Sequence, residues 1–253
     1  PFGSTPGQGG EAWDFAPQRI DFQARQFQAQ GRPLNQVQLN ALRVGEVWRG
    51  QVSAQELEGD WQYQASKSPE PAKLQARLAR LTVPASQGDA DAMPDSSVQD
   101  LPTLDIQVKD FDWRGKRLGS LELIAVNRQR PDAGSEWRLN KFRLASADAQ
   151  LSATGNWIVT GVGGGISTGG VGMQAPGART GVSASSGSGS KPQHRAAFTF
   201  TLDLNNSGAL LNRLGLPQTV KGGKGKLTGQ VAWAGSPLEP DLASMNGSMK
   251  VAI

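Results

Sequence analysis

Residues 20–41 read IDFQARQFQAQGRPLNQVQLNA and residues 104–125 read LDIQVKDFDWRGKRLGSLELIA, so the chain contains two similar stretches. They align without a gap at an offset of 84 residues, since residue 20 aligns with residue 104, and seven positions are identical. The apolar residues keep the same phase in both, which chance similarity does not usually produce. The chain therefore contains an internal repeat, which is typical of proteins built from similar units in series.

Each copy predicts a β-hairpin. In the second copy the apolar residues at 104–108 alternate with polar ones, and the alternation then shifts by one residue at Phe111; the first copy shifts at the same place, before Phe27. A change of parity inside a strand predicts a β-bulge that keeps large side chains on one face. Gly31 and Gly115 then supply the positive φ of a tight turn.

The strand pattern continues beyond the two copies. Both hairpins lead into a Trp-Arg pair and then a Gly-x-Trp sequence, at 48–61 and at 137–157, and residues 227–233 repeat the end of this pattern in part. The sequence predicts an all-β protein with an elongated, curved antiparallel sheet of repeating units and one short helix. That helix is expected to be capped by Ser207 and to end before Gly215.

Residues 72–84, AKLQARLARLTVP, fit both helical and strand periodicity. Helix propensity favours a helix, but the segment ends in Thr-Val-Pro and closes a series of strands, so we predict a strand.

Three parts are expected along the chain. Residues 1–84 form a first β-groove unit, 85–102 a linker loop, and 103–253 a second unit. Residues 161–190 are rich in Gly, Ser and Thr and have almost no large apolar residue, so we expect a disordered insertion there.

Composition excludes several classes of function. The net charge of +4 arises from 26 basic and 22 acidic residues spread along the chain, so nucleic acid is not an expected partner. The chain has no cysteine and no apolar run long enough for a membrane span. It begins without Met and with no signal peptide, so we expect a fragment whose membrane anchor lies outside it.

No motif predicts an enzyme, a metal site or a cofactor. His194 is the only histidine, and it has no acidic cluster near it in the sequence, so we interpret it as a solvated loop residue. No pair of carboxylates has glycosidase spacing, and a catalytic triad would have to recruit this single histidine. The lysines at 221–226 lie between glycines and indicate a solvated turn or, as a weaker alternative, contact with lipid phosphates through Lys221, Lys224 and Lys226.

The apolar strand faces are the remaining candidate for function. They can form the core of an ordinary sandwich, or, because the repeat adds hairpins in series, one open apolar stripe. An open stripe must meet an apolar ligand, whereas a covered face favours an assembly scaffold that offers strand edges to proteins.

The stretch GALLNRLGLPQTVKGGKGKLTGQVAWAGSP at 208–237 resembles a signature near the C-terminus of the AsmA-like family, closest to its YhdP branch. Its paired leucines, Leu-Gly-x-Pro, Gly-Gly-x-Gly-x-Leu-x-Gly and Trp-x-Gly-x-Pro are intact here. The resemblance covers 101–253 well and 13–84 more loosely, and the Gly/Ser insertion departs from it.

The resemblance implies the periplasmic part of an inner-membrane-anchored protein of a Gram-negative bacterium, with a β-groove that passively transfers phospholipid between the inner and outer membranes. Its partners would be phospholipid acyl chains, neighbouring β-groove segments of the full-length chain and proteins of the envelope. The alternative is a non-catalytic scaffold in outer-membrane biogenesis. The expected groove-lining residues are Ile106, Val108, Phe111, Trp113, Leu121, Leu123, Phe198, Phe200, Leu202 and Val231.

Overall fold

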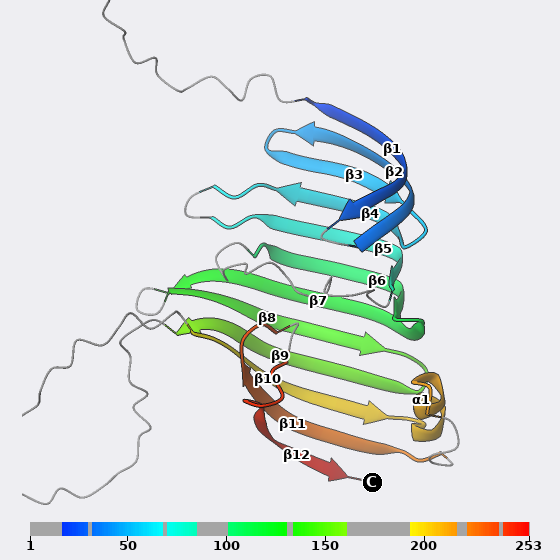
Figure 1. Ribbon diagram of the computed structural model, residues 1–253, viewed down its shortest axis with the longest axis vertical. Coiled ribbons are helices and arrows are strands. Elements are labelled where there is room, and N and C mark those ends of the chain that lie inside the picture. The colour runs from blue at the N-terminus through cyan, green and yellow to red at the C-terminus, as the bar shows by residue number, and fades with distance from the viewer. Residues whose placement is uncertain are drawn as a thin grey trace, which may run out of the picture. The chain divides into compact units, whose positions relative to one another are not determined.

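The computed structural model describes residues 17–29, 32–67, 70–84, 101–130, 134–160, 193–216, 222–237 and 240–252 (Figure 1). This part of the chain consists of strands and one short helix. The strands are β1 (Arg19–Ala29), β2 (Arg32–Val44), β3 (Val47–Ser53), β4 (Leu57–Gln64), β5 (Lys73–Val83), β6 (Thr103–Trp113), β7 (Lys116–Arg130), β8 (Gly134–Ala145), β9 (Ala149–Thr160), β10 (Gln193–Leu204), β11 (Gly225–Ala234) and β12 (Asn246–Ala252), and the helix is α1 (Ser207–Arg213).

The strands form one open sheet in chain order, β1 to β12. The all-β class with a single short helix in the described residues is therefore confirmed. The expectation of a wholly antiparallel sheet needs one correction, because β5 and β6 pair in parallel along their length. Three strands, β3, β4 and β5, follow the hairpin of the first copy, so β5 runs in the same direction as β1. β6, the first strand of the second copy, also runs in that direction. A parallel pair needs a long connection, which residues 84–102 provide.

The chain divides into two compact units. Unit 1 comprises Pro1–Met93, Pro102–Leu123 and Leu144–Ser146, and unit 2 comprises Pro94–Leu101, Ile124–Arg143 and Ala147–Ile253. The sequence placed the end of the first unit at residue 84, whereas the pairing of β5 with β6 joins Pro102–Leu123 to unit 1. The expected linker, apart from its last two residues, and the expected insertion at 161–190 lie outside the described residues.

The ambiguous segment and the helix behave as predicted, with one change at the helix start. Residues 73–83 form β5 as expected. The cap of α1 is Asn206 in place of Ser207, since the Asn206 side-chain oxygen accepts a hydrogen bond from the backbone N–H of Ala209 at 2.9 Å. The hydroxyl of Ser207 instead donates to the carbonyl of Gly222 at 3.0 Å. An N-cap oxygen must precede the first helical residue, and Asn206 has the extended backbone for it.

The hairpin turn expected in the second copy is present. Arg114 and Gly115 link β6 to β7 with φ of 52° and 75°, the two positive values of a type I′ turn. Asp112 strengthens the turn, because its side chain accepts from the backbone N–H of Gly115 at 2.8 Å. The corresponding Gly31 lies outside the described residues.

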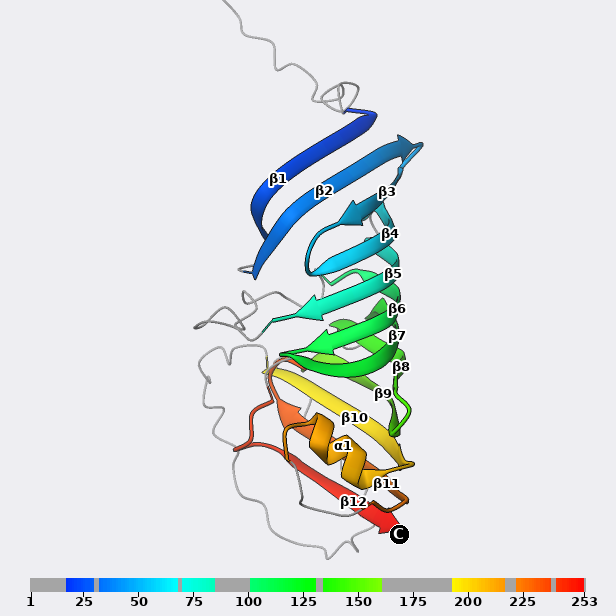
Figure 2. The same ribbon diagram turned by 90° about the vertical axis from the view of Figure 1, so that its right-hand side faces the viewer.

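Strands of unit 1 bend where the sequence changes parity (Figure 2). In β1 and β2 the irregularity affects both strands by one residue. Arg25 and Gln36 are not paired with each other, and the register is the same before and after them. Gln36 has a positive φ of 53°. In β5 it is a one-residue bulge, because Gly59 pairs with Leu78 while Glu58 pairs with Arg80. These irregularities return the large apolar side chains to the same face beyond the bend.

No helix in the described residues is long and apolar enough to cross a membrane.

Candidate functional site: the apolar face of the sheet

One face of unit 1 is lined with apolar side chains from six neighbouring strands. The strand registers align these side chains into rows across the sheet. One row is Phe22, Leu39, Val52, Gly59, Leu78 and Val108, and the next is Ile20, Ala41, Gly50, Trp61, Ala76 and Ile106. No helix and no second sheet belongs to the described part of unit 1. The face is therefore formed by a single layer.

Side chains at the centre of this face are nevertheless well covered. Val37 is 4% exposed and Val108 is 2% exposed, whereas Phe22 and Phe27, on the edge strand β1, are 37% and 44% exposed. Residues that alternate with these rows, such as Gln51, are exposed. In a bent single layer, side chains converge on the inner side and diverge on the outer side. The burial pattern therefore indicates that the apolar face is the inner side of the bend.

Unit 2 carries an equivalent apolar face on β9 to β12. Its rows pair Leu151 with Leu202, Leu227 and Val251, and place aromatic rings next to glycines. The rows with aromatic rings are Ala153, Phe200, Gly229 and Met249; Gly155, Phe198, Val231 and Gly247; and Trp157, Ala196 and Trp233. Large side chains opposite small ones keep the face continuous without a second layer of side chains.

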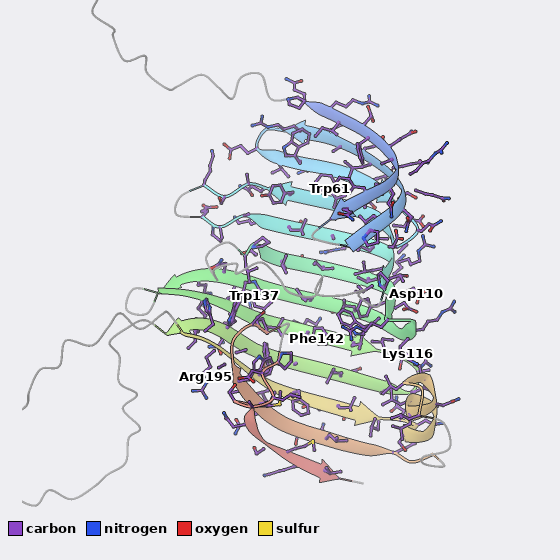
Figure 3. The ribbon with its side chains drawn as sticks, viewed as in Figure 1. Trp61, Asp110, Lys116, Trp137, Phe142 and Arg195 are labelled. Carbon is purple, nitrogen blue, oxygen red and sulfur yellow. The ribbon has the colours of Figure 1, made fainter. Side chains whose placement is uncertain are left out.

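Most aromatic residues with a polar atom gather toward one end of each apolar face, whereas Trp113 lies at the other end in unit 1. We call these groups the aromatic belts. In unit 1 the belt is Trp48, Trp61 and Tyr63, and in unit 2 it is Trp137, Trp157, His194 and Trp233. Figure 3 labels Trp61 and Trp137. The rings of Trp157 and His194 lie 5.4 Å apart, centroid to centroid. Trp and Tyr are favoured where one end of the ring is in an apolar setting and the other is near polar groups.

Hydrogen bonding differs among the belt residues. Trp233 donates through Nε1 to the carbonyl of Ser236 at 2.7 Å. Nε1 of Trp61, Nε1 of Trp157 and Nδ1 of His194 are buried and have no hydrogen-bond partner. A buried donor without an acceptor is unfavourable, so these atoms are the chemically unsatisfied points of the two faces.

The model of the family described as YhdP protein matches residues 4–253. The chain belongs to this family. The match confirms the resemblance inferred from the sequence and extends it over the loosely similar N-terminal part. Comparison with curated proteins gives no match, and comparison with solved structures gives none either.

This YhdP family member brings most of the expected lining residues onto its apolar faces. Ile106 and Val108 lie in the rows of unit 1, and Phe111 and Trp113 continue that face beyond the bend, opposite Leu81 and Val83. Phe198, Phe200, Leu202 and Val231 lie in the rows of unit 2, and Leu121 is 7% exposed at the centre of β7. Contact of these residues, and of Leu123, with lipid stays a prediction.

The expected head-group lysines are distributed differently. Lys226 alternates with Leu227, so it lies on the polar face, where its amine is 3.4 Å from Asp203. Lys224 is exposed just before β11, and Lys221 lies outside the described residues. The His194 interpretation also needs correction: the residue is in β10 and contacts Trp157, because the strand begins before it.

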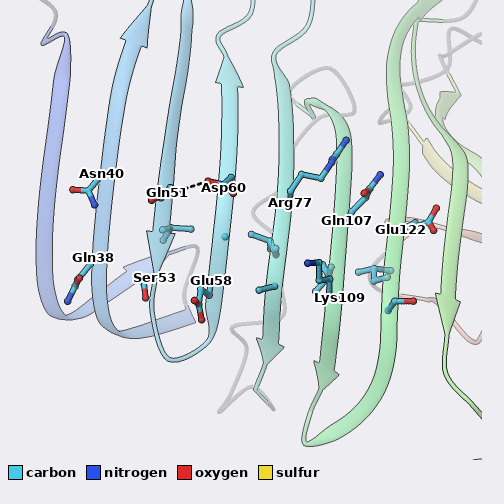
Figure 4. Close-up of a pocket in the computed structure, with 17 residues that line it drawn as sticks. Gln38, Asn40, Gln51, Ser53, Glu58, Asp60, Arg77, Gln107, Lys109 and Glu122 are labelled. Carbon is cyan, nitrogen blue, oxygen red and sulfur yellow. Dashed lines mark hydrogen bonds between the residues drawn. The ribbon is translucent and has the colours of Figure 1, made fainter.

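A polar hollow of about 730 Å³ lies on the opposite face of unit 1 (Figure 4). Its polar side chains come from β2 to β7 and include Gln51, which donates to Asp60 at 3.0 Å, and Arg77, which is 2.8 Å from Asp105 beside the hollow. Sequence reasoning did not single out this hollow, although its residues are the polar positions of the same alternation. The described residues contain no cluster of acidic and histidine side chains that could hold a metal ion.

Proposed function

We propose that this chain is a lipid-binding segment of a periplasmic groove, part of an inner-membrane-anchored protein of a Gram-negative bacterium, and that it passively transfers phospholipid between the inner and outer membranes. The observation that carries the proposal is the apolar face of unit 1, which crosses six strands and has no helix or second sheet of the described residues over it. Membership of the YhdP family supports the proposal.

The mechanism requires no covalent chemistry. Acyl chains lie on the apolar rows, and each buried methylene contributes about 0.8 kcal/mol. Because each row offers apolar side chains strand after strand, this contribution changes little as the lipid moves along the rows from one strand to the next. The lipid can therefore move along the face without being held at one position. In the full-length chain, neighbouring β-groove segments would continue the path.

The test is native mass spectrometry, with lipid extraction, of the chain purified after expression in a bacterial periplasm. We expect phospholipid to co-purify with the wild type and to be lost when Ile106 and Phe200 are both changed to Asp. The matched control changes Gln107 and Thr199 to Asp, since these exposed neighbours point to the polar face. A folded wild-type chain without lipid, or loss of lipid in both variants, would contradict the proposal.

The scaffold hypothesis keeps one specific observation in its favour. β1 and β12 each pair on one side only in the described sheet, so each leaves a strand edge for a protein of envelope biogenesis. A lipid-free wild type that captures such a protein through an edge strand would favour this function.

A further inference from the structure

Two indole N–H groups on the apolar faces have no acceptor. Trp61 in unit 1 and Trp157 in unit 2 bury Nε1 without a hydrogen bond, and Trp157 as a whole is only 5% exposed. Most buried polar atoms in proteins have a partner, and leaving one unpaired is costly. These atoms therefore mark places where a ligand atom would be stabilised.

The neighbours of each indole in its row are small residues. Trp61 pairs with Gly50 on one side and Ala76 on the other, so both neighbours in its row are small. Trp157 pairs with Ala196, which is 0% exposed. In unit 1, the described residues over Nε1 belong to the same face, since no helix or second sheet is present there.

The charged side chains around Trp61 determine which kind of ligand atom can accept a hydrogen bond from its Nε1. The charged residues next to Trp61 in the sheet, Arg49, Asp60 and Arg77, alternate with the apolar rows and lie on the polar face. Arg43, opposite Trp48 in the next row, donates to the carbonyl of Gly45 at 3.1 Å. The row of Trp61 itself contains no charged side chain. A phosphate or carboxylate placed there would be buried without a cation, which is unfavourable. A neutral carbonyl oxygen satisfies the indole without that penalty.

We propose that Trp61 and Trp157 donate hydrogen bonds through Nε1 to the ester carbonyl oxygens of a glycerolipid, and that the aromatic belts thereby set the position of its glycerol backbone on each face. The inference rests on the proposed function and names the lipid class: diacyl esters. The acyl chains extend from the belt over the apolar rows. The unpartnered Nδ1 of His194, beside Trp157, gives unit 2 a second polar atom at the same level.

The test compares two lipids that differ only in the carbonyl groups. Dipalmitoyl phosphatidylglycerol and its dihexadecyl ether analogue compete with a fluorescent phospholipid for the delipidated full chain. One hydrogen bond changes affinity by about 2- to 10-fold, so we expect the wild type to prefer the ester by at least that factor. The double variant Trp61→Phe with Trp157→Phe keeps the aromatic rings and should bind both lipids equally.

Trp233→Phe is the matched control for the ester preference alone: its Nε1 already donates to Ser236, so the substitution changes apolar contact with both lipids alike and should leave the ratio of their affinities unchanged. If the double variant does not fold, indole N–H resonances of the seven tryptophans provide the readout in the wild type. The ester lipid should shift two of them, and the ether lipid should not. Equal binding of ester and ether by the wild type overturns this inference but leaves the proposed function intact. Absence of binding for both lipids overturns both.

Discussion

The ring of Phe198 lies across Gly155, its partner on the neighbouring strand. A Cβ added to Gly155 would come within 2.2 Å of the carbonyl oxygen of Ala197 and 2.4 Å of Cδ1 of Phe198, closer than real side chains approach other atoms. The glycine is therefore required by the packing of the apolar face in unit 2, and Phe198 also stacks on Trp233 at 5.4 Å between ring centroids.

Gly155→Ala should destabilise the chain by about 1–3 kcal/mol, because both the backbone of β10 at Ala197 and the ring of Phe198 must shift. Urea unfolding followed by tryptophan fluorescence measures the change. In a Phe198→Leu background the same substitution should cost less, and the double-mutant cycle gives the coupling. Equal costs in both backgrounds would show that the ring is not the obstacle.

Gly115→Ala should destabilise unit 1 by about 1 kcal/mol. Gly115 has φ of 75° in the β6–β7 turn, a conformation that residues with a Cβ adopt at a cost. Arg114, with φ of 52°, tolerates replacement by Asn, which is common in such turns. We expect thermal unfolding to show a lower midpoint for Gly115→Ala and an unchanged or higher one for Arg114→Asn. The opposite order would be inconsistent with a type I′ turn.

Arg213 connects α1 to the β8–β9 turn. Its Nε and Nη2 lie 3.1 Å and 2.5 Å from Oδ2 of Asp148, and the two side chains are 33% and 15% exposed. Arg213→Gln should cost about 1–3 kcal/mol, since it leaves a mostly covered carboxylate without its cation. Lys226→Gln is the control, because the Lys226–Asp203 pair is 56% and 44% exposed and such pairs contribute little. Urea unfolding distinguishes the two, and equal effects would argue against an anchoring role for Arg213.

The sequence predicts the strands and turns because the alternation of apolar residues and the preferences of turn residues depend only on neighbouring positions in the chain. Phe111 and Trp113 were assigned to the face of Val108 from the change of parity alone, and Gly115 identified the turn. The parallel pairing of β5 with β6 was missed, since strand direction depends on the number of intervening strands, which no local pattern fixes. The sequence also does not predict that the indole N–H groups of Trp61 and Trp157 have no acceptor, because their possible partners lie on other strands of the sheet.

The β3–β4 turn fills a gap in the sheet between β2 and β5. β3 ends before this turn and β4 begins after it, and the turn continues the hydrogen bonding between β2 and β5 in their place. The N–H of Gln55 donates to the carbonyl of Asn35 at 2.9 Å, and the N–H of Thr82 donates to the carbonyl of Glu56 at 2.6 Å. The carboxylate of Glu56 also accepts from the backbone N–H and the side-chain amide of Asn35, at 2.8 Å and 2.6 Å. Glu56 thus holds the turn at the bend of unit 1.

Glu56→Ala should therefore destabilise the chain by about 1–3 kcal/mol, because two partly buried donors of Asn35 lose their acceptor. Glu56→Gln keeps one acceptor oxygen and should fall between the wild type and Glu56→Ala. Glu58→Ala, whose carboxylate is exposed and 3.8 Å from Arg80, is the control and should change stability by less than about 0.5 kcal/mol. Hydrogen exchange adds a local readout, since the amides of Asn35, Gln55 and Thr82 should exchange faster in Glu56→Ala if the turn leaves the ladder. Unchanged protection at these amides would mean that the backbone bonds alone hold the turn.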